Sequence, residues 1–205
     1  MKKLISIFTT LLFFGSICFA QAISADKITP LLKGSQIPYA RLSNINSEQK
    51  TLKEVLDNKP TVLIFYRGGW CPYCNLQLGE LQKIEAKLKE LGVKIVAISP
   101  DTPEKLKKSI KEKTLSYELY NDPNLNTAKA FGIAYRLDSE DYKKQLGFSE
   151  DFQEMPERTE YLLPVPAAFL VDKDGSIRFK YANANYQIRV SSDDLITQAE
   201  ALKEN

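Results

Sequence analysis

Two cysteines separated by two residues, Cys71 and Cys74, are the side chains in this sequence best suited to chemistry. They follow an apolar, β-rich run at residues 61–66 and open a helical pattern, so the sequence predicts a strand-to-helix turn there. The first turn of a helix presents unpaired N–H groups and the positive end of the helix dipole, which stabilise a thiolate. The spacing lets the second thiol reach the first, and this combination performs thiol–disulfide exchange.

Two other interpretations compete with a redox-active pair. A structural disulfide between Cys71 and Cys74 would close a very short loop and would add little to stability through chain entropy. Half of a zinc site would need further ligands, but the sequence has no histidine and only one other cysteine, Cys18. The redox-active pair is therefore the favoured interpretation.

Composition narrows the chemistry further. The 205-residue chain carries 28 Lys and Arg against 26 Asp and Glu, a net charge of +2, which argues against nucleic acid as a partner. Its 43% apolar and 26% charged residues are typical of a globular protein. The absence of histidine excludes Ser-His-Asp triads, Cys-His proteases and His-containing zinc sites. The expected chemistry needs no metal and no organic cofactor.

The elements that must position the pair follow from hydrophobic periodicity. Strands are expected at residues 61–66, 93–98, 117–120, 164–172 and 176–181, after a short strand and turn at 36–46. Helices are expected at residues 51–56, 71–91, 103–113, 127–131 and 192–203, with another near 139–146 inside an irregular insertion at 134–163. Asp101, at the end of a strand, is expected to cap the next helix. Parallel βα units followed by an antiparallel hairpin indicate an α/β fold with a mixed central sheet flanked by helices.

Residues 1–22 have the organisation of a secretory signal peptide. Basic Lys2 and Lys3 precede an apolar stretch that ends in Ala20-Gln21-Ala22. A retained membrane anchor is the alternative, since the stretch is about long enough to span a bilayer. Cleavage would remove Cys18 and place the protein in the periplasm, an oxidising compartment where cysteine pairs usually form disulfides.

Four segments resemble the thioredoxin-fold superfamily and, within it, the alkyl hydroperoxide reductase/thiol-specific antioxidant (AhpC/TSA) group. The likeness is to a peroxiredoxin-like branch that carries C-x-x-C. The segments are Phe65–Cys74, Ala97–Asp101, Leu163–Asp172 and Asn185–Arg189. The resemblance implies a single thioredoxin-like domain over residues 23–205.

The resemblance also implies roles for residues around the pair. In thioredoxin-like folds a cis-proline precedes the strand that faces the two cysteines, and Pro166 matches that position. A cis bond there would let the Val165 main chain pair with a substrate segment as a short strand; a plain proline at a strand start is the alternative. Trp70 flanks the first cysteine as in thioredoxins, where it would shield the disulfide or simply pack. Pro72 and Tyr73 form the dipeptide found in glutaredoxins.

The group contains peroxidases, and three substitutions bear on that activity. The peroxiredoxin pattern has a Pro seven residues before the peroxidatic cysteine, a Thr or Ser three before it, and an Arg just before the A-x-F strand. With Cys74 in the peroxidatic position, these places hold Arg67, Cys71 and Pro166. The missing Thr and Arg normally hold the peroxide and stabilise the charges of the reaction, so Arg67 or Arg189 would have to replace the missing Arg.

Three functional hypotheses remain, and the first is favoured. In the first, the protein is an extracytoplasmic thiol–disulfide oxidoreductase in which Cys71, expected to be the more exposed thiol, attacks a substrate disulfide and Cys74 resolves. In the second, it is a thioredoxin-dependent peroxidase for hydrogen peroxide or organic hydroperoxides, with Cys74 oxidised to sulfenic acid and resolved by Cys71. In the third, it is a non-catalytic binding module. Either enzyme would need a thiol–disulfide redox partner protein, which could be embedded in the membrane.

Overall fold

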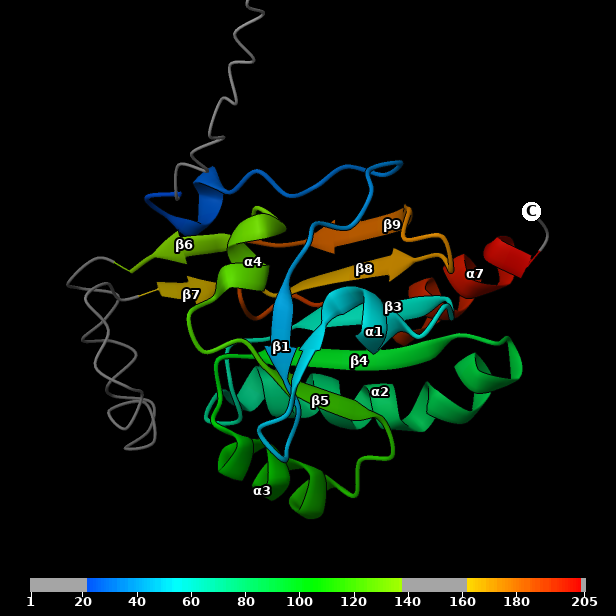
Figure 1. Ribbon diagram of the computed structural model, residues 1–205, viewed down its shortest axis with the longest axis horizontal. Helices are drawn as coiled ribbons and strands as arrows, with labels where there is room; N and C mark the ends of the chain where they lie inside the picture. The colour runs from blue at the N-terminus through cyan, green and yellow to red at the C-terminus, as the bar shows by residue number, and fades with distance from the viewer. Residues whose placement is uncertain (1–21, 138–161, 204–205) are drawn as a thin grey trace, which may run out of the picture.

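A seven-stranded mixed sheet lies at the centre of the structure, a computed structural model that describes residues 22–137 and 162–203 (Figure 1). In sheet order its strands are β2 (Gln49–Thr51), β1 (Arg41–Ser43), β5 (Glu118–Asn121), β4 (Lys94–Ser99), β3 (Thr61–Phe65), β8 (Ala167–Val171) and β9 (Ile177–Ala182). β3, β4 and β5 are parallel, whereas β8 is antiparallel to β3 and β9. This arrangement confirms the predicted α/β class.

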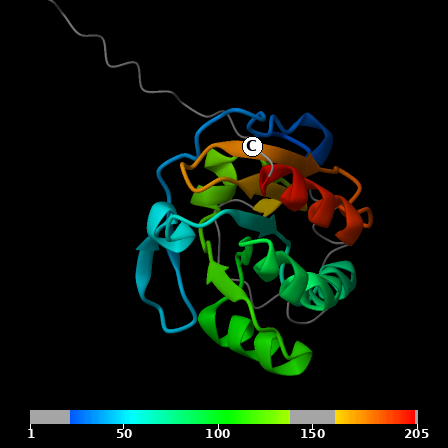
Figure 2. The ribbon, with the colours of Figure 1, turned by 90° about the vertical axis from the view of Figure 1, so that its right-hand side faces the viewer.

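Helices cover both faces of the sheet (Figure 2). One face carries α2 (Pro72–Glu90), α3 (Pro103–Lys113) and α7 (Ser192–Lys203), and the other carries α1 (Leu52–Leu56) and α4 (Asn126–Ala130). A 3-10 turn, η1 (Ala25–Lys27), precedes the sheet. A smaller antiparallel pair consists of β6 (Ala134–Arg136) and β7 (Leu162–Pro164). Apart from the segments 36–46 and 164–172, the described strands and helices of the prediction end within one residue of their predicted bounds.

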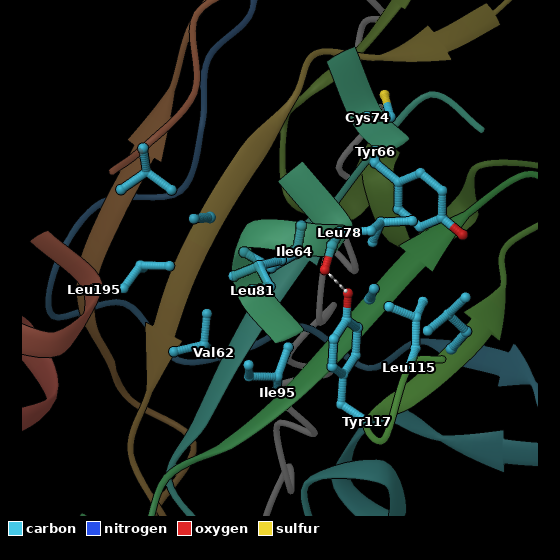
Figure 3. Packing of buried hydrophobic residues seen from close by; sticks show 14 of the residues in the cluster. Val62, Ile64, Tyr66, Cys74, Leu78, Leu81, Ile95, Leu115, Tyr117 and Leu195 are labelled. Atoms are coloured by element: carbon cyan, nitrogen blue, oxygen red, sulfur yellow. Dashed lines mark hydrogen bonds between the residues drawn. The ribbon is translucent and has the colours of Figure 1, made fainter. Parts of the chain in front are cut away.

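β3 supplies both hydrophobic cores, because all five of its residues are buried and its side chains alternate between the two faces. Val62 and Ile64 belong to the cluster under α2, α3 and α7, whereas Leu63 and Phe65 belong to the cluster under α1 and α4. Figure 3 shows Val62 and Ile64 beside Leu81 of α2. β3, which leads to the candidate site, is therefore packed against a hydrophobic cluster on each face of the sheet.

The run predicted as one strand at residues 164–172 belongs to two strands in different sheets. β7 pairs with β6, while β8 pairs with β3 and β9. Between them, the N–H of Val165 donates to the carbonyl of Ile133 at 2.8 Å. Pro166 has no N–H to give to a strand ladder, so the chain changes sheets at this residue.

Some predictions fall outside the described residues. These are the signal peptide, apart from Ala22, and the helix near residues 139–146. The carbonyl of Ala22 accepts the N–H of Arg136 at 2.9 Å, which ties the first described residue to β6. Within residues 22–137 and 162–203, the helices are too short or too polar to cross a membrane.

Replacing Phe169 with alanine is expected to lower the free energy of unfolding by about 3–5 kcal/mol. The Phe169 side chain is fully buried, and its ring centroid lies 4.9 Å from that of Phe131 and 5.9 Å from that of Phe65. Its loss would leave a cavity between packed rings. Urea unfolding followed by circular dichroism measures the effect. Phe179→Ala, at a partly buried position of β9, is the control, and an equal loss there would contradict this account of the core.

Candidate active site

Cys71 and Cys74 lie at the turn between β3 and α2, where the sequence places them. Cys71 is the N-cap of α2, and Pro72 takes the first helical position, where its fixed φ and missing N–H suit the start of a helix. Cys74 follows in the first turn, and the N–H of Asn75 donates to the Cys71 carbonyl at 3.0 Å. Both thiols therefore lie at the positive end of a 19-residue helix.

A buried carboxylate fixes the loop before the two cysteines. Oδ2 of Asp101 accepts the Gly69 N–H at 2.8 Å and the Ser99 hydroxyl at 3.0 Å. Gly68 has a φ of +139°, a conformation that residues with a side chain rarely adopt. The prediction that Asp101 caps the next helix is wrong. Thr102 caps α3, because its hydroxyl accepts a first-turn N–H at 3.4 Å, and Asp101 points to the loop instead.

The two thiols are buried and differ in acidity. The exposed fraction is 1% for Cys71 and 0% for Cys74, so Cys71 is scarcely more exposed than its partner, contrary to expectation. Hydrogen bonds from the Cys74 side chain and backbone, helped by the charges of Arg67 and Arg189, lower the pKa of Cys71 to about 6 despite its burial. Burial raises the pKa of Cys74 well above its usual value. Cys71 is therefore the thiolate at neutral pH, and Cys74 stays protonated beside it.

Two arginines adjoin the cysteines. Nη2 of Arg189 lies 3.3 Å from Sγ of Cys74. The Arg67 guanidinium stacks between two rings, 4.9 Å from the centroid of Trp70 and 4.2 Å from that of Tyr186. Both arginines that the sequence offers as replacements for the family arginine are thus at the site, and Trp70 packs against one of them.

Tyr186 is the site residue that sequence reasoning missed. Besides its contact with Arg67, its ring meets that of Tyr73 edge to face, with centroids 5.8 Å apart. Tyr186 lies in the block Asn185–Arg189 that carries part of the family resemblance, and this block was the available signal. Among residues 22–137 and 162–203, no group of three His, Cys, Asp or Glu side chains could hold a metal ion.

The predicted cis-proline at Pro166 is wrong, because the described chain has no cis peptide bond. Val165 is fully buried, and its N–H is already bonded to the carbonyl of Ile133. The Val165 N–H is therefore not free to pair with a substrate segment. The carbonyl of Pro166 accepts the N–H of Asn183 at 3.4 Å. Pro166 precedes β8 as an ordinary strand-start proline.

Alkylation of Cys71 by iodoacetamide is expected to follow a pKa near 6. Below that pH the thiolate fraction, and with it the rate, should fall about tenfold per unit, and above about pH 7 the rate should be flat. Cys74, whose pKa is raised, should stay unmodified across this range. Peptide mass spectrometry after timed labelling separates the two cysteines. A midpoint near pH 9 at Cys71 would contradict stabilisation of its thiolate by Cys74 and the two arginines.

A mixed sheet flanked by helices, with a C-x-x-C dithiol at the N-terminus of the helix that follows a central strand, defines a thioredoxin-fold thiol oxidoreductase. The AhpC/TSA family model matches residues 33–180, and the chain belongs to this family. The resemblance drawn from the sequence is thereby confirmed. Because the family match and the curated relatives point to enzymes, the protein is an oxidoreductase, which contradicts the binding-module hypothesis.

Curated relatives include both kinds of enzyme considered from the sequence. The chain is 32% identical to a putative peroxiredoxin bcp of Haemophilus influenzae over 106 residues. The matched region is 52% of this chain and 68% of that protein. It is 31% identical to the thiol-disulfide oxidoreductase ResA of Halalkalibacterium halodurans over 101 residues. Here the matched region is 49% of this chain and 56% of that protein. The chain thus spans between about half and two thirds of these relatives, and their names alone do not choose between the two reactions.

Solved structures share the fold. Reduced Prx3 from Vibrio vulnificus superposes with a TM-score of 0.67 at 17% identity, covering 83% of this chain and 99% of that one. Peroxidoxin BcpB from Mycobacterium tuberculosis gives a TM-score of 0.63 at 18% identity, covering 83% and 97%. At such identities the likeness establishes a single thioredoxin-like domain of the peroxiredoxin type.

Proposed function

We propose that the protein is an extracytoplasmic thiol–disulfide oxidoreductase in which Cys71 attacks and Cys74 resolves. The observation that carries this proposal is the place of Cys71 at the N-cap of α2, where contact with Cys74 and the charges of Arg67 and Arg189 lower its pKa to about 6, whereas burial raises the pKa of Cys74. An attacking thiol must be ionised at the working pH, whereas a resolving thiol can stay protonated until the mixed disulfide has formed. Relatives named ResA add support from the family.

The proposed reaction has two steps. The Cys71 thiolate attacks one sulfur of a disulfide, a mixed disulfide forms, and a substrate thiolate leaves and takes up a proton. Cys74 then gives up its proton and attacks Sγ of Cys71, which forms the Cys71–Cys74 disulfide and releases the second substrate thiol. Arg189, with Nη2 3.3 Å from Sγ of Cys74, favours the thiolate that the second step needs. Two electrons pass from the dithiol to the substrate.

Fluorescence of Trp70, the single tryptophan, provides the test. Reduced protein is mixed at pH 6 with 2-hydroxyethyl disulfide or hydrogen peroxide, and free cysteine is the reference for each oxidant. At this pH about half of Cys71 is ionised against well under 1% of free cysteine, since free cysteine has a pKa of about 8.5. After allowance for the lower nucleophilicity of an acidic thiol, we expect about a tenfold faster reaction with the disulfide. A rate equal to that of free cysteine would contradict the proposal.

A peroxidase is the second candidate, and the contact between Arg189 and Cys74 favours it. Here a Cys74 thiolate would attack the peroxide, release water or an alcohol, and become a sulfenic acid that Cys71 converts to the disulfide with loss of water. The raised pKa of Cys74 opposes this reading, because the attacking thiol would be protonated. In the same fluorescence experiment, peroxide oxidation orders of magnitude above that of free cysteine, lost in Cys74→Ser, would support the peroxidase.

The periplasm is the proposed location, supported by the signal-peptide pattern of residues 1–22. A thiol–disulfide redox partner, membrane-embedded or soluble, would then restore the starting state of the dithiol. We expect mass spectrometry of the protein from a periplasmic extract to give a chain that begins at Ile23, or at Gln21 if cleavage follows Ala20. Recovery of the protein from the cytoplasm with Met1 in place would contradict the proposed location.

A further inference from the structure

Four buried arginine nitrogens beside the dithiol have no hydrogen-bond partner within residues 22–137 and 162–203. They are Nε and Nη2 of Arg67 and Nε and Nη1 of Arg189. A guanidinium carries only donors and is always charged, and leaving its donors unpaired inside a protein is costly. Arg67 is 1% exposed, so water outside the molecule does not reach it. These four donors would be satisfied by a ligand whose oxygen atoms accept hydrogen bonds.

The surroundings hold Arg67 in place without using these donors. Stacking between Trp70 and Tyr186 fixes the plane of the guanidinium and contacts only its faces. Arg189 is held through Nη2, which lies against Sγ of Cys74. The edge formed by Nε and Nη2 of Arg67 is therefore available at a fixed orientation, and Nε and Nη1 of Arg189 add two further donors. Both charges act on Cys71. A planar donor edge matches a carboxylate best, because the two oxygens can accept paired N–H groups.

The burial of the two sulfurs bears on the size of the substrate. With exposed fractions of 1% and 0%, Cys71 and Cys74 are reached in this conformation more readily by a small molecule than by a folded protein, and a redox partner protein would reach them only after the loop moves. Tyr73 and Tyr186, both only half-buried, pack edge to face next to Arg67. A flexible small disulfide needs less displacement of the surrounding chain to reach these sulfurs than a disulfide held in a folded protein does.

We propose that the substrate is a small disulfide with a carboxylate close to its sulfur atoms, and that Arg67 and Arg189 bind this carboxylate while Cys71 attacks. The inference rests on the proposed exchange function and specifies its substrate class. The Cys71 thiolate bonds to the nearer substrate sulfur, the substrate S–S bond breaks, and the departing carboxylate-bearing thiolate takes up a proton. Cys74 loses its proton, bonds to Cys71 and releases the other carboxylate-bearing thiol. The dithiol is oxidised by two electrons, and one disulfide becomes two thiols.

The test compares three small disulfides that differ in charge: anionic 3,3′-dithiodipropionate, neutral 2-hydroxyethyl disulfide and cationic cystamine. Oxidation of the reduced protein is followed by Trp70 fluorescence, and each rate is divided by that of free cysteine with the same disulfide. We expect the anionic disulfide to exceed the neutral one by on the order of tenfold in this ratio, the size expected for a charge-assisted pair. We expect the cationic disulfide to fall below the neutral one.

Arginine variants locate the effect. Arg67→Met and Arg189→Met should each reduce the preference for the anionic disulfide several-fold, and Arg67→Lys should retain part of it because the charge stays. Arg178→Met is the matched control, since Arg178 is exposed and paired with Asp172 away from the dithiol, and it should keep the full preference. Circular dichroism checks that each variant is folded, and Arg189→Met keeps the test open if Arg67→Met is not.

The outcomes separate the inference from the function on which it rests. If no disulfide oxidises the protein faster than it oxidises free cysteine, the proposed function fails. If all three disulfides react equally above that level, exchange stands and the carboxylate inference is overturned. A preference for the anionic disulfide that persists in both Arg67→Met and Arg189→Met also overturns it, because the charge would then be recognised elsewhere.

Discussion

Replacing Cys71 with serine is expected to slow oxidation of the protein by disulfides by roughly a thousandfold or more. A serine hydroxyl does not ionise near neutral pH, whereas the pKa of Cys71 is about 6, so the variant loses the only thiolate of the pair. Cys74 remains, but burial keeps it protonated. Stopped-flow fluorescence of Trp70, together with release of the substrate thiol, measures the loss. A variant that still reacts at a tenth of the wild-type rate would assign the attack to Cys74.

Cys74→Ser is the matched variant for the second step. It retains the attacking thiolate, so we expect one substrate thiol to be released for each protein molecule and the other to stay attached. Mass spectrometry of the protein, intact and after digestion without reductant, should show the added mass and place it on the peptide that contains Cys71. Attachment that does not depend on which cysteine was replaced would contradict the assigned order of attack and resolution.

Gly68→Ala is expected to have the second large effect, a loss of roughly 2–4 kcal/mol in the free energy of unfolding together with slower alkylation of Cys71. The φ of +139° at Gly68 disfavours any side chain. A Cβ there would lie 2.5 Å from Nε1 of Trp70 and 2.8 Å from Oδ1 of Asp101. To relieve these contacts the loop must move away from the carboxylate that anchors it, and the helix N-cap moves with it. Urea unfolding and iodoacetamide kinetics measure the two losses.

Gly79→Ala supplies a control of opposite sign in the adjoining helix. Gly79 lies within α2, and a Cβ added there would meet no atom within 4 Å. Alanine loses less backbone entropy than glycine in a helix, so this variant should gain about 0.5–1 kcal/mol with unchanged reactivity at Cys71. If both glycine variants lost stability to the same extent, the loss at Gly68 would reflect a general intolerance rather than the contacts named above.

Local sequence patterns were sufficient for the scaffold and for the position of the dithiol. The apolar run at 61–66 could be identified as a strand buried on both faces, because such a strand has no polar side to interrupt it. The helix after it could be placed from the periodicity of its apolar residues and from Pro72 near its start. Cys71 and Cys74 lie between this strand and this helix, so the position of the pair could be predicted without knowledge of any tertiary contact.

Contacts between distant segments could not be predicted in this way. The bond from Gly69 to Asp101 and the stacking of Tyr186 on Arg67 join residues from separate elements, and no local period reports them. The residues on both sides of Pro166 favour strands. Residues 164–172 are divided between two sheets only because β7 pairs with β6 whereas β8 pairs with β3. The burial of Cys71 has the same origin, because a helix start is exposed by default until another segment packs against it.

The two segments that form the site differ in their stability against local unfolding. The dithiol follows β3, which is fully buried and pairs with β4 and β8 on its two sides. Tyr186 lies between β9 and α7 in a segment with local bonds, such as that from the Gln187 N–H to the Asn185 side chain at 3.0 Å. Amide hydrogen exchange should therefore be slowest in β3, near the limit set by global unfolding, and fast around Tyr186 through small local openings. The Tyr186 ring can therefore leave Arg67 and return many times before β3, the strand that precedes the dithiol, opens once.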